Sequence, residues 1–305
     1  MSTNTPRPTK AQRRDDARAK AIAMRQEQER KARRTRLIAI GGLVAAVLVL
    51  GGVVLAIVRQ GQANAEAYGQ VVYGGGEQGV VAPALADVET PEGADESGGI
   101  VIGKDGVGDT GDGDETVVDV YFDFMCPWCG RFDAANAEEL DRLAATGDVT
   151  VIYHNISFLD GSSQGTFYST RAANAAAVVA AESPEHYTDF VTALYANQPD
   201  EGSSGLTDAK IAEIAQGVGV PASVTDQFTA VVDGTYEVGE GDAKQTADGT
   251  WRTYAPFVAA ATRQAGVDLG KLTTPTVLID GEPFQGDLYT PGALTQAVEA
   301  AAAKG

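Results

Sequence analysis

The chain contains 305 residues, 44% of them apolar, and carries a formal net charge of −19 at pH 7. This length and composition fit one sizeable hydrophobic core with appendages. The charge is unevenly divided: residues 1–36 hold 12 Lys or Arg against 4 Asp or Glu, whereas the residues after Val58 hold 11 against 38. With only two cysteines, the sequence excludes a scaffold built on several disulfides.

An apolar run occupies residues 37–58 and contains no charged or hydrogen-bonding side chain. As a helix it is about 33 Å long, enough to span a bilayer. A basic cluster precedes the run and only Arg59 follows it closely, so the positive-inside rule predicts a cytoplasmic tail at 1–36. We therefore expect a single-pass protein of the cell membrane with its larger part outside the cytoplasm, and no nucleic-acid partner.

A cleavable secretory signal is the alternative to this anchor. Ala63, Asn64 and Ala65 form a small-x-small pattern, which would place cleavage after Ala65. The apolar run is longer than the usual signal core, and a long segment precedes it. The anchor is therefore the favoured interpretation.

Residues 59–98 are rich in glycine, alanine, proline and acidic residues, and we predict a flexible linker there. The folded domain is predicted to cover 99–305 and to open with strands at 100–102 and 116–125. Between these strands, several aspartates and Glu115 stand among glycines. Because the spacing of a calcium-binding EF-hand loop is missing, a solvated acidic turn is favoured over a calcium site.

The two cysteines lie where the second strand meets a helix. Residues 127–146 have a proline one position inside the helix start, apolar residues roughly along one side, and Gly147 just past the end. A further strand is predicted at 148–158. The segment therefore reads strand-helix-strand, a parallel pair with a right-handed crossover.

A mostly helical block follows, with predicted helices at 170–181, 184–197, 206–216, 221–232 and 254–265. After it come a strand, an Asp-Gly turn and a second strand within 274–284, and then a helix at 291–302. This order predicts an α/β thioredoxin fold, a mixed sheet flanked by helices. The fold would carry a helical insertion at about 163–265 and be preceded by one transmembrane helix.

Cys126 and Cys129 form a Cys-Pro-Trp-Cys motif with three conceivable uses. A structural disulfide would close too small a loop to stabilise the fold much. A zinc site would need His154 and His186, which lie far apart in sequence, and no second close ligand pair is present. A redox-active disulfide Cys126–Cys129 is the interpretation that the motif favours, and we expect neither a metal nor a cofactor.

In the redox interpretation Cys126 caps the helix, where free backbone N–H groups and the helix dipole lower the pKa of a thiol. Cys126 is then the nucleophile, and the less exposed Cys129 resolves the mixed disulfide. Pro127 and Trp128 tune the reduction potential, and Trp128 is also a candidate contact for client peptides. Asp123 is a candidate proton acceptor for Cys129 if it is buried, with a solvated or capping carboxylate as the alternative.

The run from Asp123 to Cys129, together with Thr274-Pro275-Thr276, resembles the DsbA family of thiol-disulfide oxidoreductases. Residues 158–160 and 168–174 are similar to the start of the helical insertion in membrane-anchored actinobacterial members. The resemblance implies a cis bond before Pro275, which would lie beside the cysteines. It also implies that the Thr274 backbone pairs with an extended client peptide, and that Pro275 belongs to the catalytic site with Cys126 and Cys129.

Two features depart from the best-known members of that family. Trp128 stands where histidine is common, and an acidic, glycine-rich stretch runs from Asp233 to Gly249. The resemblance implies reduced or misoxidised exported proteins as clients and a VKOR-like membrane partner as reoxidant. The favoured hypothesis is a dithiol oxidase; a membrane-tethered reductase or isomerase and a non-catalytic anchored binding module are the alternatives.

Overall fold

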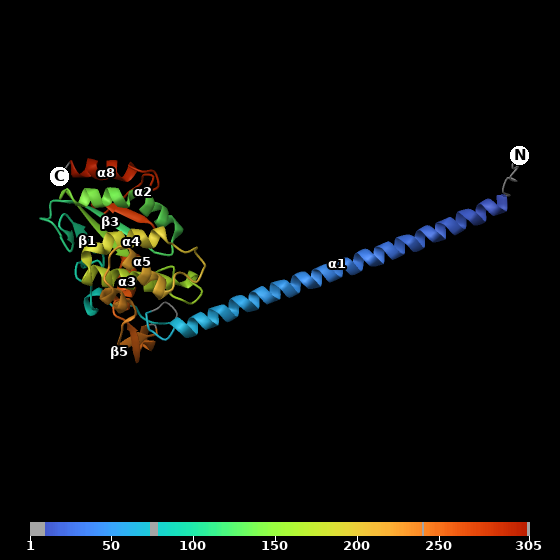
Figure 1. Ribbon diagram of the computed structural model, residues 1–305, viewed down its shortest axis with the longest axis horizontal. Coiled ribbons are helices and arrows are strands. Elements are labelled where there is room, and N and C mark those ends of the chain that lie inside the picture. The colour runs from blue at the N-terminus through green and yellow to red at the C-terminus, as the bar shows by residue number, and fades with distance from the viewer. Residues whose placement is uncertain (1–9, 74–78, 240, 304–305) are drawn as a thin grey trace. The chain divides into compact units, whose positions relative to one another are not determined.

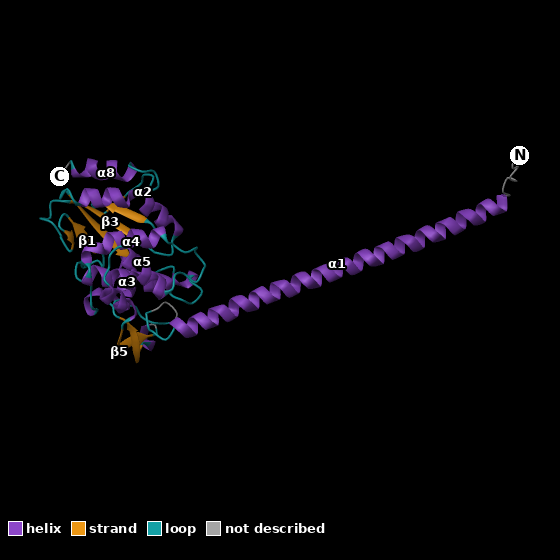
Figure 2. Ribbon diagram, viewed as in Figure 1, coloured by secondary structure: helices purple, strands orange, loops and turns teal. Residues whose placement is uncertain are grey.

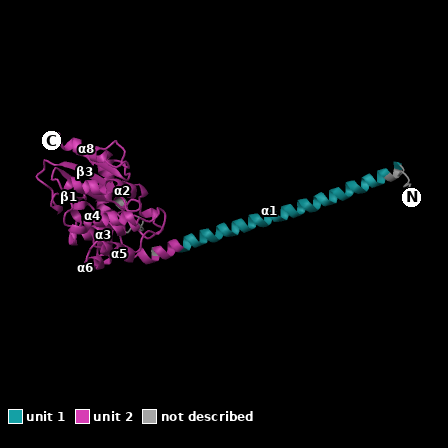
Figure 3. Ribbon diagram, turned by 45° about the horizontal axis from the view of Figure 1, so that its top comes forward, with its two compact units in different colours: residues 1–59 teal, residues 60–305 magenta. Residues whose placement is uncertain are grey.

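The computed structural model describes residues 10–73, 79–239 and 241–303 (Figure 1). They fall into two compact units, Met1–Arg59 and Gln60–Gly305 (Figure 3). The first unit holds most of helix α1, Lys10–Tyr68, in which every residue of the apolar run is exposed. Among the described residues, α1 is the one helix long and apolar enough to cross a membrane.

The second unit is built on a mixed six-stranded sheet with the order β2-β1-β4-β3-β7-β8. The two central strands β3 and β4 are parallel, whereas β7 is antiparallel to β3 and β1 is antiparallel to β4. The strands are β1 Ile100–Gly103, β2 Gly106–Val107, β3 Thr116–Phe122, β4 Val149–Asn155, β7 Thr276–Ile279 and β8 Glu282–Pro283. This is the mixed sheet that the sequence predicts.

The predicted strand-helix-strand unit is present as β3, helix α2 (Pro127–Ala144) and β4. Because side chains alternate along a strand, Val120 faces the main core while Tyr121 packs on the other side with Ala265 of helix α7 (Ala255–Leu269). Strand β3 ends at Phe122, three residues earlier than predicted. The chain turns there, and the Cys126 N–H donates to the Asp123 carbonyl at 3.0 Å.

Along the sequence, the helical block lies between β4 and β7. Helix α8 (Ala293–Ala302) packs beside α2 (Figures 1 and 2). Helix α3 (Tyr168–Glu182), which is rich in alanine, is almost wholly buried because alanines allow close packing from every side. The helices are α3 Tyr168–Glu182, α4 Tyr187–Ala196, α5 Asp208–Gly217, α6 Ala222–Thr225, α7 Ala255–Leu269 and α8 Ala293–Ala302. The helical insertion and its place in the fold are as predicted.

The predicted helix 221–232 is wrong at its end. Helix α6 ends at Thr225 and a 3-10 helix covers Asp226–Thr229. The chain then forms a two-stranded antiparallel sheet of β5 (Val231–Val238) and β6 (Gln245–Arg252). The acidic, glycine-rich stretch therefore lies in a hairpin. Glycine suits this place, since a Cβ at Gly234 would come within 2.4 Å of the Trp251 ring.

The flexible linker predicted over 59–98 also differs from the structure. Helix α1 continues through Tyr68, and residues from Gln60 onward belong to the same compact unit as the sheet. Val80 pairs with Val238 of β5, and Ala94 pairs with Ile100 of β1. Backbone hydrogen bonds to strands hold this segment on the domain, which its glycine-rich composition did not indicate.

Candidate functional site

Cys126 occupies the N-cap position of α2, with extended backbone angles of φ −77° and ψ 115°, and Pro127 is the first helical residue. The Cys126 carbonyl accepts the Cys129 N–H at 3.0 Å, so one helical turn separates the two thiols. Cys126 is 5% exposed and Cys129 is fully buried, and both are free thiols in this structure. The expected difference in exposure is present, and the arrangement is that of a reduced dithiol.

The surroundings of the two thiols shift their pKa values in opposite directions. A hydrogen bond from the Cys129 thiol, with further ones from Thr274 and the backbone N–H groups of Cys129 and Trp128, lowers the pKa of Cys126 to about 6 against the opposing effect of burial. Burial, and then the neighbouring Cys126, raise the pKa of Cys129 well above its usual value. Near neutral pH, Cys126 is therefore mostly a thiolate and Cys129 a thiol.

The segment before β7 lies beside Cys126. The Thr274–Pro275 peptide bond is cis, as the resemblance implies, and the Thr274 carbonyl lies 3.5 Å from the Cys126 sulfur. Residues 148 positions apart in sequence thus meet at the reactive thiol. This places Pro275 and Thr274 at the site, together with the two cysteines.

Asp123 is fully buried next to the dithiol. Its carboxylate accepts hydrogen bonds from the Met125 N–H at 2.8 Å, the Leu159 N–H at 3.0 Å and the Ser169 hydroxyl at 2.6 Å. Burial raises the pKa of Asp123 to about 7, although these hydrogen bonds oppose the shift. The alternative of a solvated carboxylate does not hold, and a group with this pKa gains and loses protons near neutral pH.

The model of the family described as Thioredoxin matches residues 110–300 of this chain. The chain belongs to the thioredoxin family. Its fold resembles DsbG of Mycobacterium tuberculosis, a disulfide bond oxidoreductase, at 26% identity and a TM-score of 0.50, covering 66% of this chain and 86% of that one. DsbA of the same organism gives 25% identity and a TM-score of 0.50, over 66% and 91% of the two chains. These likenesses place the chain with the DsbA type of the thioredoxin family.

Two further similarities cover different shares of the chain. MdbA of Actinomyces oris, a thiol-disulfide oxidoreductase, shares the fold at 22% identity and a TM-score of 0.53, covering 72% of this chain and 97% of that one. The serine/threonine-protein kinase PknE of Mycobacterium tuberculosis is 34% identical over 148 residues, which are 47% of this chain and 26% of the kinase. This thioredoxin-family chain thus spans about a quarter of the length of that curated relative.

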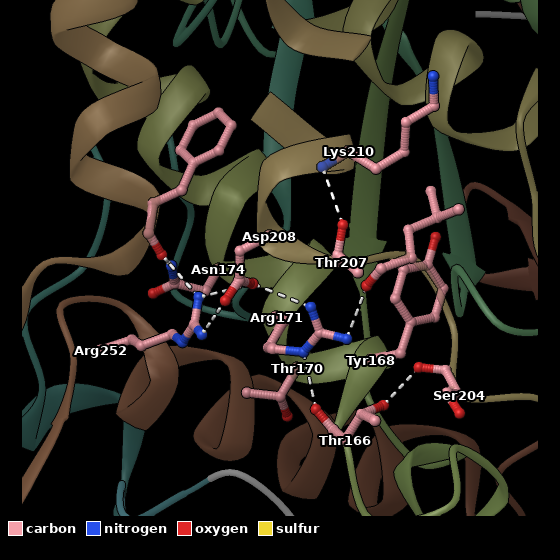
Figure 4. A network of polar contacts seen from close by, with 12 residues as sticks. Thr166, Tyr168, Thr170, Arg171, Asn174, Ser204, Thr207, Asp208, Lys210 and Arg252 are labelled. Atoms are coloured by element: carbon pink, nitrogen blue, oxygen red, sulfur yellow. Dashed lines mark hydrogen bonds and ion pairs between the residues drawn. The ribbon is translucent and has the colours of Figure 1, made fainter. Parts of the chain in front are cut away.

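Helix α3 brings consecutive polar side chains to the buried side of the thioredoxin-family site. Ser169 donates to Asp123, and Thr170 donates to Asp160, a second fully buried carboxylate. Arg171 then binds Asp208, which also accepts from Arg252 (Figure 4). No local pattern indicates these contacts, because the bonded residues lie 10 to 46 positions apart along the chain.

Trp128, between the cysteines, is 49% exposed and is braced by two neighbours. The Arg131 guanidinium lies 4.6 Å from the centre of the Trp128 ring and 5.0 Å from that of Tyr289. The two rings are 5.4 Å apart. Cation–π contacts of this kind hold the indole at the surface next to Cys126.

A cavity of about 380 Å³ adjoins Pro275 and is partly lined by the apolar side chains of Phe284 and Leu288. It lies on the side of β7 and β8, the last strands of the sheet. Among the described residues, no group of three or more His, Cys, Asp or Glu side chains is arranged to hold a metal ion.

Proposed function

We propose that this chain is a thiol-disulfide oxidoreductase that introduces disulfides into exported proteins. The observation that carries the proposal is the unequal pair of thiols: the pKa of Cys126 is lowered to about 6, and that of Cys129 is raised well above its usual value. A stabilised thiolate stabilises the reduced enzyme relative to the disulfide. The disulfide form is therefore a good oxidant, and electrons pass from client to enzyme.

The reaction begins with the oxidised enzyme. A client thiolate attacks the Cys126 sulfur, the bond between Cys126 and Cys129 breaks, and Cys129 leaves with the electron pair and takes up a proton. A second client thiolate attacks the client sulfur of the mixed disulfide, which forms the client disulfide and releases Cys126 as a thiolate. Two electrons have then moved from the client dithiol to the enzyme.

Three neighbours support these steps. Asp123, whose pKa is raised to about 7 by burial, supplies the proton that Cys129 needs as it leaves. The Thr274 backbone lies beside Cys126 and pairs with an extended client chain. The cavity lined by Phe284 and Leu288 accepts an apolar client side chain.

The same proposal assigns α1 as a membrane anchor with residues 1–36 in the cytoplasm and the dithiol outside. The apolar run and the basic residues before it support this orientation. Reoxidation then falls to a membrane partner of the VKOR-like type, which takes two electrons from the dithiol. Protease added to intact cells should degrade the catalytic unit and leave a tag at the N-terminus intact; a degraded tag would reverse the orientation.

The activity is tested with the oxidised full-length chain in detergent and reduced, unfolded ribonuclease A as the probe. We expect thiols to disappear from the probe as those of Cys126 and Cys129 appear in equal number. Neither Cys126→Ser nor Cys129→Ser can form the intramolecular disulfide, so each variant abolishes the reaction. Equal thiol loss with the parent chain and with Cys126→Ser would refute the assigned function.

A further inference from the structure

The turn that carries Cys126 is held by a side chain from the helical insertion. Gln198 follows α4, and its amide nitrogen donates to two backbone carbonyls, those of Phe124 at 2.9 Å and Cys126 at 2.8 Å. Its own backbone N–H donates to the Tyr195 carbonyl at 3.1 Å, which fixes the start of the side chain. The two amide protons therefore match two acceptors that flank Met125.

A glycine makes room for this contact. A Cβ placed on Gly130 would come within 2.5 Å of the Gln198 amide oxygen. The glycine is not needed for its backbone angles, since Gly130 lies within α2 and is absent from the residues with positive φ. Alanine would suit a helix interior better than glycine, which has the lower helix propensity. The space beside Cys129 is thus explained by the glutamine that fills it.

The hydrogen bonds from Gln198 affect the Cys126 thiolate through the geometry of the turn. The Cys126 carbonyl also accepts the N–H groups of Cys129 and Gly130, at 3.0 and 3.4 Å, so it ties the first helical turn together. The N–H groups of Trp128 and Cys129 in that turn are among those that stabilise the Cys126 sulfur. A carbonyl released from Gln198 lets the turn shift and misdirects these donors.

We infer that Gln198 is a positioning residue for the Cys126 thiolate, acting through the carbonyls of Phe124 and Cys126 in space that Gly130 leaves open. The helical insertion thereby sets the acidity of the reactive thiol. The inference rests on the proposed function because it concerns the same dithiol. Its test is independent of any client, so failure of one does not entail failure of the other.

The experiment follows alkylation of Cys126 by iodoacetamide between pH 4 and 9 in the reduced, full-length chain, read by mass spectrometry. Gln198→Met keeps the length of the side chain and removes the donor. The pH midpoint of Cys126 alkylation should rise in this variant. The acid dissociation constant of the thiol should fall about two- to tenfold, the range expected for one hydrogen bond. The equilibrium with glutathione should shift by the same factor towards the disulfide.

Gly130→Ala provides the second, independent variant, since it displaces the Gln198 amide without altering a cysteine. Its midpoint should rise in the same direction, and the double variant should shift no further than the larger single one. Gln227→Ala and Gly217→Ala serve as controls, because Gln227 is exposed and a Cβ at Gly217 meets open space. An unchanged alkylation midpoint in Gln198→Met overturns the inference. If that variant does not fold, an unchanged midpoint in Gly130→Ala overturns it. Shifts of the two single variants that add up in the double variant overturn it as well.

Discussion

At the scale of single residues, the site separates two chemically identical thiols by their surroundings. Cys126 caps a helix and meets hydrogen-bond donors, whereas Cys129 is enclosed by apolar packing. The pKa of an acid falls when its anion is stabilised and rises when the anion is desolvated. The assignment of nucleophile and resolver follows from this contrast.

The contrast predicts a defined pH dependence for the reduced enzyme. The folded pKa of Cys126, about 6, lies below the value near 8.5 of an unfolded cysteine, so the thiolate stabilises the reduced fold fully above about pH 8.5. That contribution is lost as the pH falls through about 6. Unfolding of the reduced and oxidised forms in urea from pH 5 to 9 measures this contribution. The free energy of unfolding of the reduced form, relative to that of the oxidised form, should fall as the pH is lowered through this window. A constant difference would contradict the assigned acidity.

The contribution of Asp123 to the stability of the fold depends on pH in the opposite direction. Its folded pKa of about 7 exceeds the unfolded value near 3.9, so the contribution to stability is full below about pH 4 and is lost as the pH rises through 7. Relative to Asp123→Asn, the parent chain should lose stability on the order of a few kcal/mol between pH 4 and 8. Urea titrations measure this, with the exposed Asp148→Asn as control. Parallel pH profiles for parent and Asp123→Asn would exclude the raised pKa.

At the scale of elements, helix α3 links the site to the helical insertion. Ser169 reaches Asp123, and two residues later Arg171, only 3% exposed, shares Asp208 with Arg252. Burial opposes ionisation of Asp208, but the hydrogen bonds and charges of Arg252 and Arg171 lower its pKa. One carboxylate thus pairs with two guanidinium groups that have little access to water.

Removing that carboxylate should strongly destabilise the insertion. Asp208→Asn leaves Arg171 and Arg252 without their counter-charge, and loss of one partner of a buried pair costs about 3–5 kcal/mol. The matched control is Glu213→Gln in the same helix, whose pair with Lys210 is exposed and contributes at most about 0.5 kcal/mol. Urea unfolding compares the two variants. A loss as small as that of Glu213→Gln would mean that the network is solvated.

Local sequence patterns predicted the strand and helix that carry the two cysteines. They failed where the structure depends on contacts between segments that are distant in sequence. A strand running into a proline-started helix is a local signal, so Cys126 and Cys129 were placed correctly. Gln198 and Ser169 approach the site from the insertion, and no local pattern marks them. The hairpin at β5 and β6 was missed: the sequence predicted a helix up to residue 232 and no element in the glycine-rich stretch after it, where Gly234 makes room for Trp251 across the strands.

At the scale of the whole molecule, the described residues after Gln60 belong to the catalytic unit and are not a loose tether. The Val72 N–H donates to Thr250 at 2.8 Å, and the Val81 N–H donates to Glu237 at 2.9 Å. Hydrogen exchange of the full chain should show both amides protected, because such bonds must open before exchange. Exchange of these two amides at the rate of an unfolded peptide would favour the flexible linker predicted from the sequence.

The central claim is that electrons flow from client to enzyme, and the reduction potential of Cys126 and Cys129 against glutathione tests it most directly. A lowered Cys126 pKa stabilises the dithiol, so the potential should lie well above that of thioredoxin, towards about −120 mV, the value of DsbA. In cells, the pair should then rest as the disulfide. A potential near about −270 mV, that of thioredoxin, would contradict the account and make the chain a reductase.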